Sequence, residues 1–436
     1  MKLNKVTCLM VVCIGVFCSL AYSSDQKKVA VRNGLPNLYS KLEAGEDVTI
    51  AYFGGSITAQ NGYRMQTFKW FEENWPQCEF TQVNAAIGGT GSELGAFRLY
   101  DDVLSNDPDL VFIEFAVNDY GASQNSQKNV EESMEGIIRQ IINNNPQTDM
   151  CLVYTITESM IEDMKAGKML PSIAAHEKVA DHYGLPSVNV GSVVADLENE
   201  GKLVMKGQQG LMQAVSGDSL NETVEVGVNE KGQVVFSKDG VHPYPNSGHK
   251  IYTQCIVEAI ALLRGDAENK EHEQLPCLNE NNLEKAKMVS LSMANLKGDW
   301  KKYNPEGGVV SSWIADKMPE MMVAKSIGDS IEFRLNGFVA GFYDVMGPSA
   351  GVVECQVDDE KKYLSRFDKY CTYYRIGSKT IEVEKGIHDV KFTLTDRPIE
   401  KAAVLSERGS VMKDRSKYED THWYVGKIML VGDIIK

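Results

Sequence analysis

The sequence predicts an α/β domain with a parallel sheet between two layers of helices, followed by a smaller antiparallel β-sandwich domain. Between residues 48 and 265, short apolar runs alternate with amphipathic stretches, which is the pattern of a parallel sheet covered on both faces. After a polar and charged stretch at 266–285, short alternating strands lie between glycine-containing turns. A chain of 436 residues is long enough for two domains. We therefore expect an α/β domain at 29–265, a linker at 266–285 and a β-sandwich at 286–436.

Apolar runs in the first domain predict buried strands, and the amphipathic stretches between them predict helices. The strands are expected at 48–53, 80–85, 110–117, 151–155 and 186–190. The helices are expected at 63–74, 93–104, 130–144 and 247–263. Residues 202–238 interrupt this pattern because they are rich in Gly, Gln and charged residues, and we expect a long excursion there with room for a hairpin.

The second domain is predicted from short runs in which apolar and polar residues alternate. Such alternation is typical of strands that bury one face, and the glycine-containing turns between the runs favour antiparallel pairing. The strands are expected at 330–335, 351–357, 380–383, 389–394 and 423–431.

The N-terminus has the pattern of a secretory signal peptide. A positively charged start is followed by a short apolar core at 11–20 and by small residues at the usual cleavage spacing at 21–23. The apolar run is too short to span a bilayer comfortably. We expect a signal peptide at 1–23 and a secreted or periplasmic protein. A lipid anchor at Cys18 is the alternative, which Phe17 disfavours because a small residue normally precedes a lipidated cysteine.

The charge of the chain argues against partners that are themselves anionic. The net charge is −15, and loss of Lys2 and Lys5 with the signal changes it to −17. So acidic a protein is not expected to bind nucleic acid or an anionic membrane surface. Beyond the signal, no stretch of the sequence is long and apolar enough to cross a membrane.

Six cysteines remain after the signal, and their spacing predicts no metal site. There is no CxxC pair and no Cys/His spacing typical of zinc, so no metal is expected. Export would permit disulfides, and Cys355 with Cys371 is one candidate pair. Buried free thiols are the alternative, since Cys151 and Cys255 lie within apolar runs.

Polar and glycine-rich segments follow the first three predicted strands of the α/β domain. The first strand runs into Ser56, the second into Ile-Gly-Gly-Thr-Gly at 87–91, and the third into Asn118. The carboxyl ends of parallel strands meet at one edge of a sheet, which is where such folds place their sites. If the strands are ordered second, first, third, Ser56 lies between the other two segments.

These residue types suit acyl transfer. A serine hydroxyl attacks an ester carbonyl, and donors must already point at the oxygen on which negative charge collects. The backbone amides of Ser56 and Gly89 are candidate donors because glycine lets the chain approach closely. The side-chain amide of Asn118 is a third candidate, so the predicted oxyanion hole consists of Ser56, Gly89 and Asn118.

The serine also needs a base, and the sequence offers one with an orienting carboxylate. His242 follows Asp239 by three residues in Asp-Gly-Val-His-Pro, so the carboxylate can reach the imidazole within a single loop. The chain order Ser, Asp, His is one that serine hydrolases use. Each motif alone is a common turn, but all of them together, in order and at one predicted edge, favour a catalytic triad of Ser56, Asp239 and His242.

These segments resemble the four sequence blocks of the SGNH/GDSL hydrolases. Gly55-Ser56 resembles the first block, 84–99 the second, 116–119 the third and 239–243 the last. The resemblance implies a flavodoxin-like three-layer α/β/α fold and ester hydrolysis without a metal or other cofactor, with the residue roles given above. Two blocks depart from the usual pattern: the first reads Gly-Gly-Ser-Ile at 54–57 where the family name spells Gly-Asp-Ser-Leu, and the third has Ala116 where Gly is usual.

Aromatic residues near the site and in the second domain suggest a glycan substrate. Tyr120, Tyr373 and Trp423 are candidate substrate-binding residues, because rings with polar edges suit stacking on sugars; packing in the core is the alternative. Together with export, they favour a carbohydrate ester as substrate and removal of O-acyl, especially O-acetyl, groups. A lipase or thioesterase acting on longer chains is one alternative. A glycan-binding protein with a vestigial hydrolase fold is another.

Overall fold

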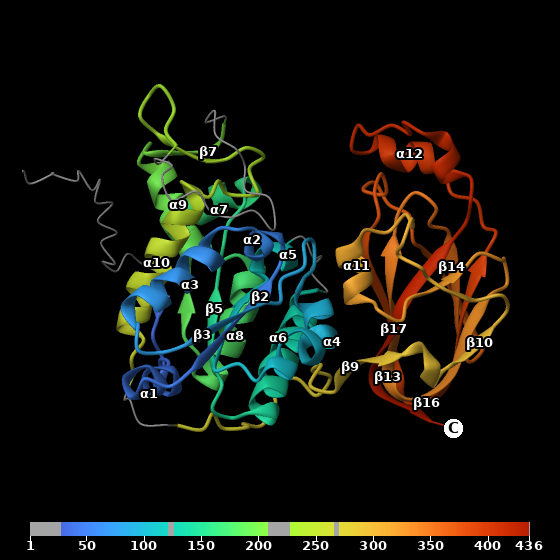
Figure 1. The fold of residues 1–436 in the computed structure, drawn as a ribbon, viewed down its shortest axis with the longest axis horizontal. Helices are drawn as coiled ribbons and strands as arrows, with labels where there is room; N and C mark the ends of the chain where they lie inside the picture. The colour runs from blue at the N-terminus through green and yellow to red at the C-terminus, as the bar shows by residue number, and fades with distance from the viewer. Residues whose placement is uncertain (1–27, 121–125, 208–226, 266–269, 436) are drawn as a thin grey trace, which may run out of the picture.

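The computed structural model describes residues 28–120, 126–207, 227–265 and 270–435. The expected signal peptide at 1–23, with Cys18, lies outside these ranges, as does the start of the expected linker. Figure 1 shows two bodies side by side, an α/β domain and a β-rich domain. The expectation of an α/β domain followed by an antiparallel β-rich domain is confirmed.

The sheet of the N-terminal domain has the strand order β1-β6-β5-β4-β2-β3 among the described residues. All neighbours pair in parallel except β1, which adds to one edge antiparallel to β6. The order second, first, third of the sequence prediction is confirmed, because β2 lies between β3 and β4. The strands are β1 (Val29–Ala30), β2 (Val48–Gly54), β3 (Phe80–Asn84), β4 (Leu110–Glu114), β5 (Asp149–Val153) and β6 (Ser187–Val188).

Helices cover both faces of this sheet. Helices α1, α3, α9 and α10 pack over one face, and α4, α6 and α8 over the other (Figure 1). The short α2 and α5 begin at the carboxyl ends of β2 and β4, where the chain turns away from the sheet. The helices are α1 (Pro36–Ala44), α2 (Ser56–Ala59), α3 (Tyr63–Asn74), α4 (Ser92–Asp102), α5 (Ala116–Asp119), α6 (Ser126–Asn144), α7 (Ile161–Lys165), α8 (Pro171–Tyr183), α9 (Val190–Asn199) and α10 (Gly248–Leu262).

The expected excursion at 202–238 contains a small sheet of its own. β7 (Leu203–Lys206) pairs in parallel with β8 (Val234–Ser237), so the two strands do not form a hairpin. A tight turn closes instead just before β8, where Val228 and Val234 form an antiparallel bridge. Residues 208–226, between the two strands, lie outside the described ranges.

The described C-terminal domain forms one antiparallel sheet, and the long strands β17, β13 and β16 are neighbours in the middle of it. A register shift at Gly337–Val339 interrupts β13 where it pairs with both neighbours. The strands are β9 (Ala286–Ser290), β10 (Asn295–Lys297), β11 (Lys301–Lys302), β12 (Met322–Ala324), β13 (Ser330–Met346), β14 (Val352–Val357), β15 (Glu360–Ser365), β16 (Arg375–Thr395) and β17 (Trp423–Ile435). The helices here are α11 (Ser312–Lys317) and α12 (Lys401–Ser406).

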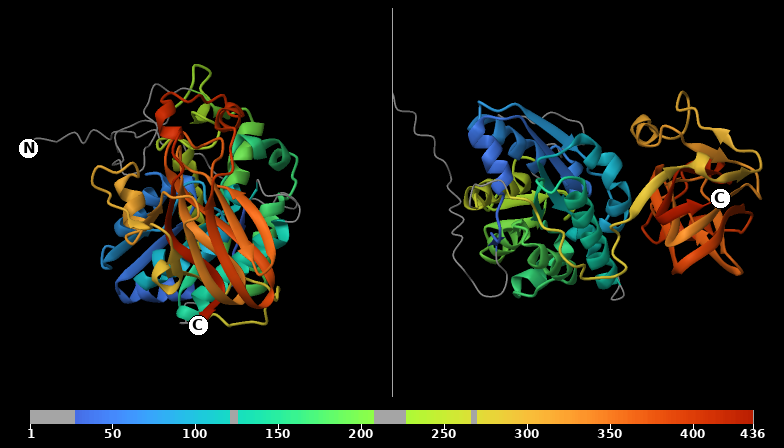
Figure 2. Two further views of the ribbon diagram at one scale, coloured as in Figure 1. Left: turned by 90° about the vertical axis from the view of Figure 1, so that its right-hand side faces the viewer. Right: turned by 90° about the horizontal axis from the view of Figure 1, so that it is seen from below.

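Strand β17 is covered on both faces, by the core of its own domain on one and by the α/β domain on the other, so it lies at the contact between the two domains. Trp423 and Ile428 point into the core of the C-terminal domain, whereas Tyr424 and Met429 belong to the hydrophobic cluster that includes the α/β domain. Side chains alternate between the faces of a strand, so an apolar strand of this kind needs cover on both sides. The contact lies along α4, which packs against β9, and the right view of Figure 2 shows the C-terminal body beside the teal helices of the α/β domain.

The six cysteines of the described ranges are all free thiols. Cys355 and Cys371 therefore do not form the candidate disulfide, because they lie in two separate hydrophobic clusters. Burial raises the pKa of each of these two thiols to about 12. None of the helices in the described ranges has the length and apolar character needed to cross a membrane.

Candidate active site

Ser56 is the first residue of α2 and stands two positions after the end of β2. The intervening turn is tight, since a Cβ added to Gly54 would lie 2.6 Å from both the Glu114 carbonyl oxygen and the Thr58 hydroxyl. Glycine at position 54 thus lets β2 approach β4 closely just before the serine. The result is a partly exposed Ser56 at the carboxyl edge of the sheet.

The structure brings Ser56, His242 and Asp239 together. His242 Nε2 lies 2.9 Å from Ser56 Oγ, and His242 Nδ1 lies 2.8 Å from Asp239 Oδ2. The second carboxylate oxygen, Asp239 Oδ1, accepts the backbone N–H groups of Val241 at 2.9 Å and His242 at 2.8 Å. This arrangement fixes the imidazole between a hydroxyl and a carboxylate, which is the geometry of a general base with its orienting group.

The pKa of Asp239 reflects these contacts. Burial is the largest single contribution and opposes ionisation, but hydrogen bonds from the His242 ring and from the backbone amides of His242 and Val241 outweigh it. The pKa of Asp239 is therefore held below its ordinary value. The carboxylate is ionised across the neutral range and can stabilise an imidazolium on His242.

The loop that carries the pair is anchored at both ends. Ser237 Oγ accepts the Gly240 N–H at 2.8 Å, and the Gly240 carbonyl accepts the Glu158 N–H at 2.7 Å. Gly240 has a φ of 82°, a left-handed conformation that favours glycine. The bridge between Ser237 and Pro243 then closes the loop against β8.

The candidate oxyanion donors lie next to Ser56. Gly89 adopts a φ of +74° in an open, exposed turn, which a larger residue would strain. Its neighbour Gly88 faces the serine, since a Cβ there would lie 3.5 Å from Ser56 Cβ. The Asn118 side chain covers Gly55, whose Cβ would lie 2.0 Å from Asn118 Oδ1. The serine, the glycine-rich turn and the asparagine thus converge as the strand order predicts.

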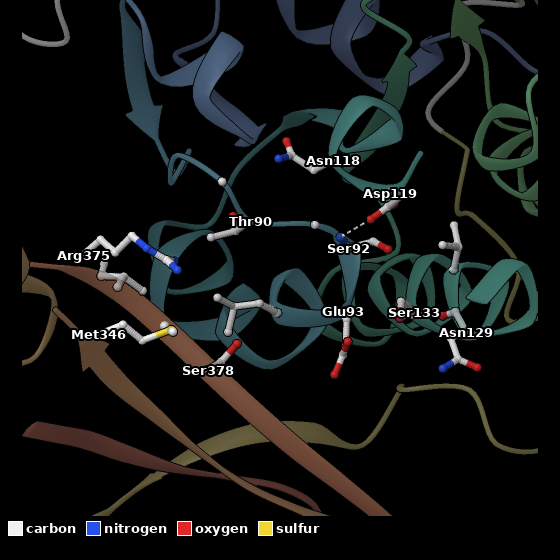
Figure 3. Close-up of a pocket in the computed structure, with 16 residues that line it drawn as sticks. Thr90, Ser92, Glu93, Asn118, Asp119, Asn129, Ser133, Met346, Arg375 and Ser378 are labelled. Carbon is white, nitrogen blue, oxygen red and sulfur yellow. Dashed lines mark hydrogen bonds between the residues drawn. The ribbon is translucent and has the colours of Figure 1, made fainter. Parts of the chain in front are cut away.

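A cleft of about 350 Å³ opens beside these donors, between the two domains (Figure 3). The α/β domain contributes the glycine-rich turn, Asn118 and the first turn of α4. The C-terminal domain contributes Met346 and the start of β16, and Figure 3 shows the Arg375 guanidinium directed toward Thr90. Two regions separated by more than two hundred residues in the sequence therefore line a single cleft.

Comparison with known families identifies the N-terminal domain. Residues 52–208 match the model of the GDSL-like Lipase/Acylhydrolase family, a segment that contains Ser56, Gly89 and Asn118. We therefore call the N-terminal domain GDSL-like. The members of the matched family are acylhydrolases, which makes the protein a carboxylic ester hydrolase. A search of curated proteins found no match to the chain.

Two solved structures resemble nearly the whole chain. One is a two-domain esterase (CEX) active on acetylated mannans and co-crystallized with mannopentaose; it is 22% identical with a TM-score of 0.68, and the match covers 94% of this chain and 97% of that one. The other, also described as a two-domain esterase (CEX) active on acetylated mannans, is 22% identical with a TM-score of 0.69 and coverages of 94% and 98%. At this level of identity the likeness is one of fold, and it extends over both domains.

Behind the glycine-rich turn at 87–91 of the GDSL-like domain lies a buried Asp–His pair. Asp119 Oδ1 accepts the Ser92 N–H at 2.9 Å, which joins the end of α5 to the start of α4. Asp119 Oδ2 lies 2.9 Å from Nε2 of His176, a fully buried side chain on α8. Asp119 therefore braces the loop that carries Asn118. No motif in the sequence pointed to His176, because it lies on an ordinary amphipathic helix.

A second histidine near the site is a core residue of the GDSL-like domain. His249 is fully buried; its Nδ1 accepts the Tyr63 N–H at 3.1 Å, and its Nε2 lies 3.2 Å from Gln60 Oε1. Burial lowers the pKa of His249 to about 3, so its imidazole stays neutral. Both ring nitrogens are engaged in the core, and His242 is the imidazole that reaches Ser56.

The three aromatic residues expected to bind substrate differ in how deeply they are buried and in how close they lie to the cleft. Trp423 is 1% exposed and packs on Trp300 and Phe342, so the expectation that it contacts substrate is corrected: its ring belongs to the domain core. Tyr120 is half-buried and packs against the GDSL-like core outside the residues that line the cleft. Tyr373 is exposed and lies two residues before Arg375, next to the cleft.

Two buried charges of the GDSL-like domain were not among the expected site residues. Arg98 on α4 is 2% exposed; it donates to the carbonyls of Gly54 and Ala85 and pairs with Asp102. It thereby ties the carboxyl ends of β2 and β3 together. Glu114, at the end of β4, is 1% exposed. A glutamate within the apolar run Leu-Val-Phe-Ile-Glu-Phe was the available signal, because charges are rarely buried without a partner.

Within the described ranges, no group of three or more His, Cys, Asp or Glu side chains is arranged to hold a metal ion.

Proposed function

We propose that the protein is an exported serine esterase that removes O-acetyl groups from a carbohydrate through an acyl-enzyme. The observation that carries the proposal is the continuous hydrogen-bonded series Ser56–His242–Asp239 beside a cleft that begins at Gly89 and Asn118. A nucleophile in contact with an oriented base, next to preorganised donors, is what ester hydrolysis by covalent catalysis requires.

In the first half of the reaction, Ser56 Oγ attacks the ester carbonyl while His242 Nε2 accepts the hydroxyl proton. The negative charge on the carbonyl oxygen is stabilised by the amides of Ser56, Gly89 and Asn118. The imidazolium, stabilised by Asp239, returns the proton to the departing sugar hydroxyl, and the acetyl group stays on Ser56. In the second half, His242 activates a water that hydrolyses the acyl-enzyme and releases acetate.

The cleft supports a carbohydrate rather than a lipid as the alcohol part of the ester. Its lining includes Asn118, Asn129, Ser133, Arg375 and Ser378, which offer donors and acceptors for hydroxyl groups. The two structural neighbours that match both domains are described as active on acetylated mannans. An acetylated mannan is therefore the first polymer to test as a substrate.

Export is part of the proposal and rests on the signal-like pattern at residues 1–23. A polymeric glycan is met outside the cytoplasm, so the location and the substrate agree with one another. N-terminal sequencing of the protein recovered from the periplasm or the medium tests this point. A mature chain that begins near residue 24 is expected, and a chain retained whole in the cytoplasm contradicts it.

The activity is tested with a series of p-nitrophenyl esters and with acetylated mannan, each compared between the wild type and Ser56→Ala. We expect hydrolysis of the acetate without added metal, a steep fall beyond about four acyl carbons, and release of acetate from the polymer. Highest activity on long chains favours the lipase or thioesterase alternative. Glycan binding with no ester hydrolysis favours a binding protein with a vestigial hydrolase fold.

A further inference from the structure

A buried carboxylate that the mechanism above does not use lies directly behind the nucleophile. We propose that Glu114 is a positioning residue that holds the turn carrying Ser56, so that the active form of the enzyme requires its carboxylate. This inference rests on the proposed function, because it concerns the rate of the same esterase reaction. The evidence for it is the set of contacts that the Glu114 side chain makes. This side chain is only 1% exposed, so it cannot contact a substrate directly.

Three donors from three places in the fold converge on this carboxylate. The Thr58 hydroxyl in α2 donates to Oε2 at 2.9 Å, and the Thr155 hydroxyl after β5 donates to Oε1 at 2.7 Å. The backbone N–H of Gly55, the residue before Ser56, also donates to the carboxylate. Glu114 thus contacts the segments on either side of the nucleophile, one residue before it and two residues after it.

The contacts continue away from the site as a chain of hydroxyl groups. Thr58 Oγ1 lies 2.7 Å from the Tyr63 hydroxyl on α3. Because Thr58 gives its hydrogen to Glu114, it accepts the hydrogen of Tyr63, and each donor in the chain has one orientation. Buried networks of this kind specify geometry when every member is satisfied.

Protonation of Glu114 would disturb this chain. A protonated carboxyl carries a hydrogen of its own, which must be donated, so one of the threonine hydroxyls has to rotate and become an acceptor. The ionised form therefore fits the three donors, and the protonated form does not. Misplacing a nucleophile by a fraction of an ångström lowers the chemical rate more than it weakens substrate binding.

The balance between the two forms lies close to neutral pH. Burial raises the pKa of Glu114 to about 7, against the hydrogen bonds from Thr155, Thr58 and Gly55, which lower it. The negative charge of Asp119 raises it further. The other ionisable groups facing it in the described part of the chain are the buried phenols of Tyr63 on α3 and Tyr252 on α10, both neutral at this pH.

This places two ionisations on the acid side of the rate profile. His242 must lose its proton to act as a base, and Glu114 must lose its proton to hold the turn. The acid limb of the wild-type kcat/KM profile should therefore follow the uptake of two protons, of which the one on Glu114 binds with a pKa of about 7. Asp239, whose pKa is lowered, stays ionised along this limb.

The test is the pH dependence of aryl acetate hydrolysis by Glu114→Gln. Glutamine keeps the shape of the side chain but, like the protonated carboxyl, carries hydrogens that must be donated, so we expect kcat at pH 8 to fall by about tenfold or more, with KM nearly unchanged. Its acid limb should show one proton instead of two. Glu114→Ala, which leaves the donors without an acceptor, should lose about a hundredfold in kcat. Circular dichroism at each pH confirms that the variants are folded.

Glu135→Gln is the matched control. Glu135 is also fully buried and accepts backbone N–H groups, from Leu278 and Asn279, but it contacts neither Ser56 nor the glycine-rich turn at 87–91. It should keep the two-proton profile. A one-proton limb in the wild type, or a two-proton limb in Glu114→Gln, overturns the proposal even if esterase activity and its dependence on Ser56 are established. Loss of the proposed function would instead show as no activity in the wild type or full activity in Ser56→Ala.

Discussion

Asn118 lies directly over Gly55, so that a Cβ at position 55 would come within 2.0 Å of Asn118 Oδ1. The contact lies at one of the positions where the chain departs from the usual family blocks. With any larger residue at position 55, the amide of Asn118 could not keep its present place. Gly55 is therefore coupled to the proposed oxyanion donor Asn118 and not only to the path of the chain.

Gly55→Ala should lower kcat by about ten- to a hundredfold, because it displaces one oxyanion donor. Its thermal midpoint should change little, since the atom that must move is the end of a side chain and the φ of Gly55 is −93°, which alanine tolerates. Steady-state kinetics and a melting curve measure both effects. The double variant Gly55→Ala/Asn118→Ala should be no slower than Asn118→Ala alone. Additive losses would mean that Gly55 acts by another route.

Loss of the base should be at least as damaging as loss of its orienting carboxylate. His242→Ala removes the group that accepts the serine proton, whereas Asp239→Ala removes only orientation and charge support. We expect a loss of at least about a thousandfold in kcat for His242→Ala and an equal or smaller loss for Asp239→Ala. A larger loss in Asp239→Ala would indicate a more direct role for that carboxylate.

The free energy of unfolding should depend on pH in a way that reflects the raised pKa of Glu114. Its pKa is raised from 4.5 to about 7 in the fold, so its contribution to stability is fully present below about pH 4.5 and is lost as the pH rises through 7. Relative to Glu114→Gln, the wild type should lose up to about 3 kcal/mol of unfolding free energy between pH 4.5 and 8. Urea unfolding at several pH values measures the difference. Parallel stability curves for the two proteins would contradict the raised pKa.

The cleft predicts that the C-terminal domain contributes to substrate binding. Arg375→Ala should raise the KM for acetylated mannan by about tenfold and leave the hydrolysis of p-nitrophenyl acetate nearly unchanged, because only the larger ligand reaches both domains. Arg334→Ala is the control, since Arg334 is exposed and pairs with Asp389 away from the cleft. Equal KM values for the polymer in all three proteins would exclude Arg375 from the binding site.

Truncation is a poorer test of the same idea. A chain that ends near Gly265 would expose the apolar surface of the α/β domain that now packs on Tyr343, Tyr424 and Met429. Aggregation through that surface would then obscure any effect on substrate binding.

The sequence predicted the parts of the fold that depend on local pattern. Buried parallel strands read as apolar runs, and their carboxyl ends meet at one edge, so Ser56, Gly89 and Asn118 could be placed together before the structure was known. The neighbourhood of Asp239 and His242 followed from their spacing within one loop. These inferences needed no knowledge of how distant helices pack.

The remaining features depend on contacts that no local pattern encodes. Arg375 reaches the cleft only because β16 packs beside α4, and the two lie far apart in the chain. Trp423 was a candidate for stacking on a sugar because the sequence does not distinguish an exposed tryptophan from a buried one. In the structure its Nε1–H donates a hydrogen bond to Asp344 at 3.2 Å inside the core. Glu114 was detectable only as a charge in an apolar strand, and its three donors come from separate segments.

The most direct test of the central claim is covalent labelling with a serine-directed fluorophosphonate, followed by peptide mapping. The account predicts one label per chain, located on Ser56, formed rapidly by the wild type and slowly by His242→Ala, because the base activates the nucleophile. Ser56→Ala should take up no label while remaining folded. A wild-type protein that stays unlabelled, or that carries the label on a different serine, would contradict the account.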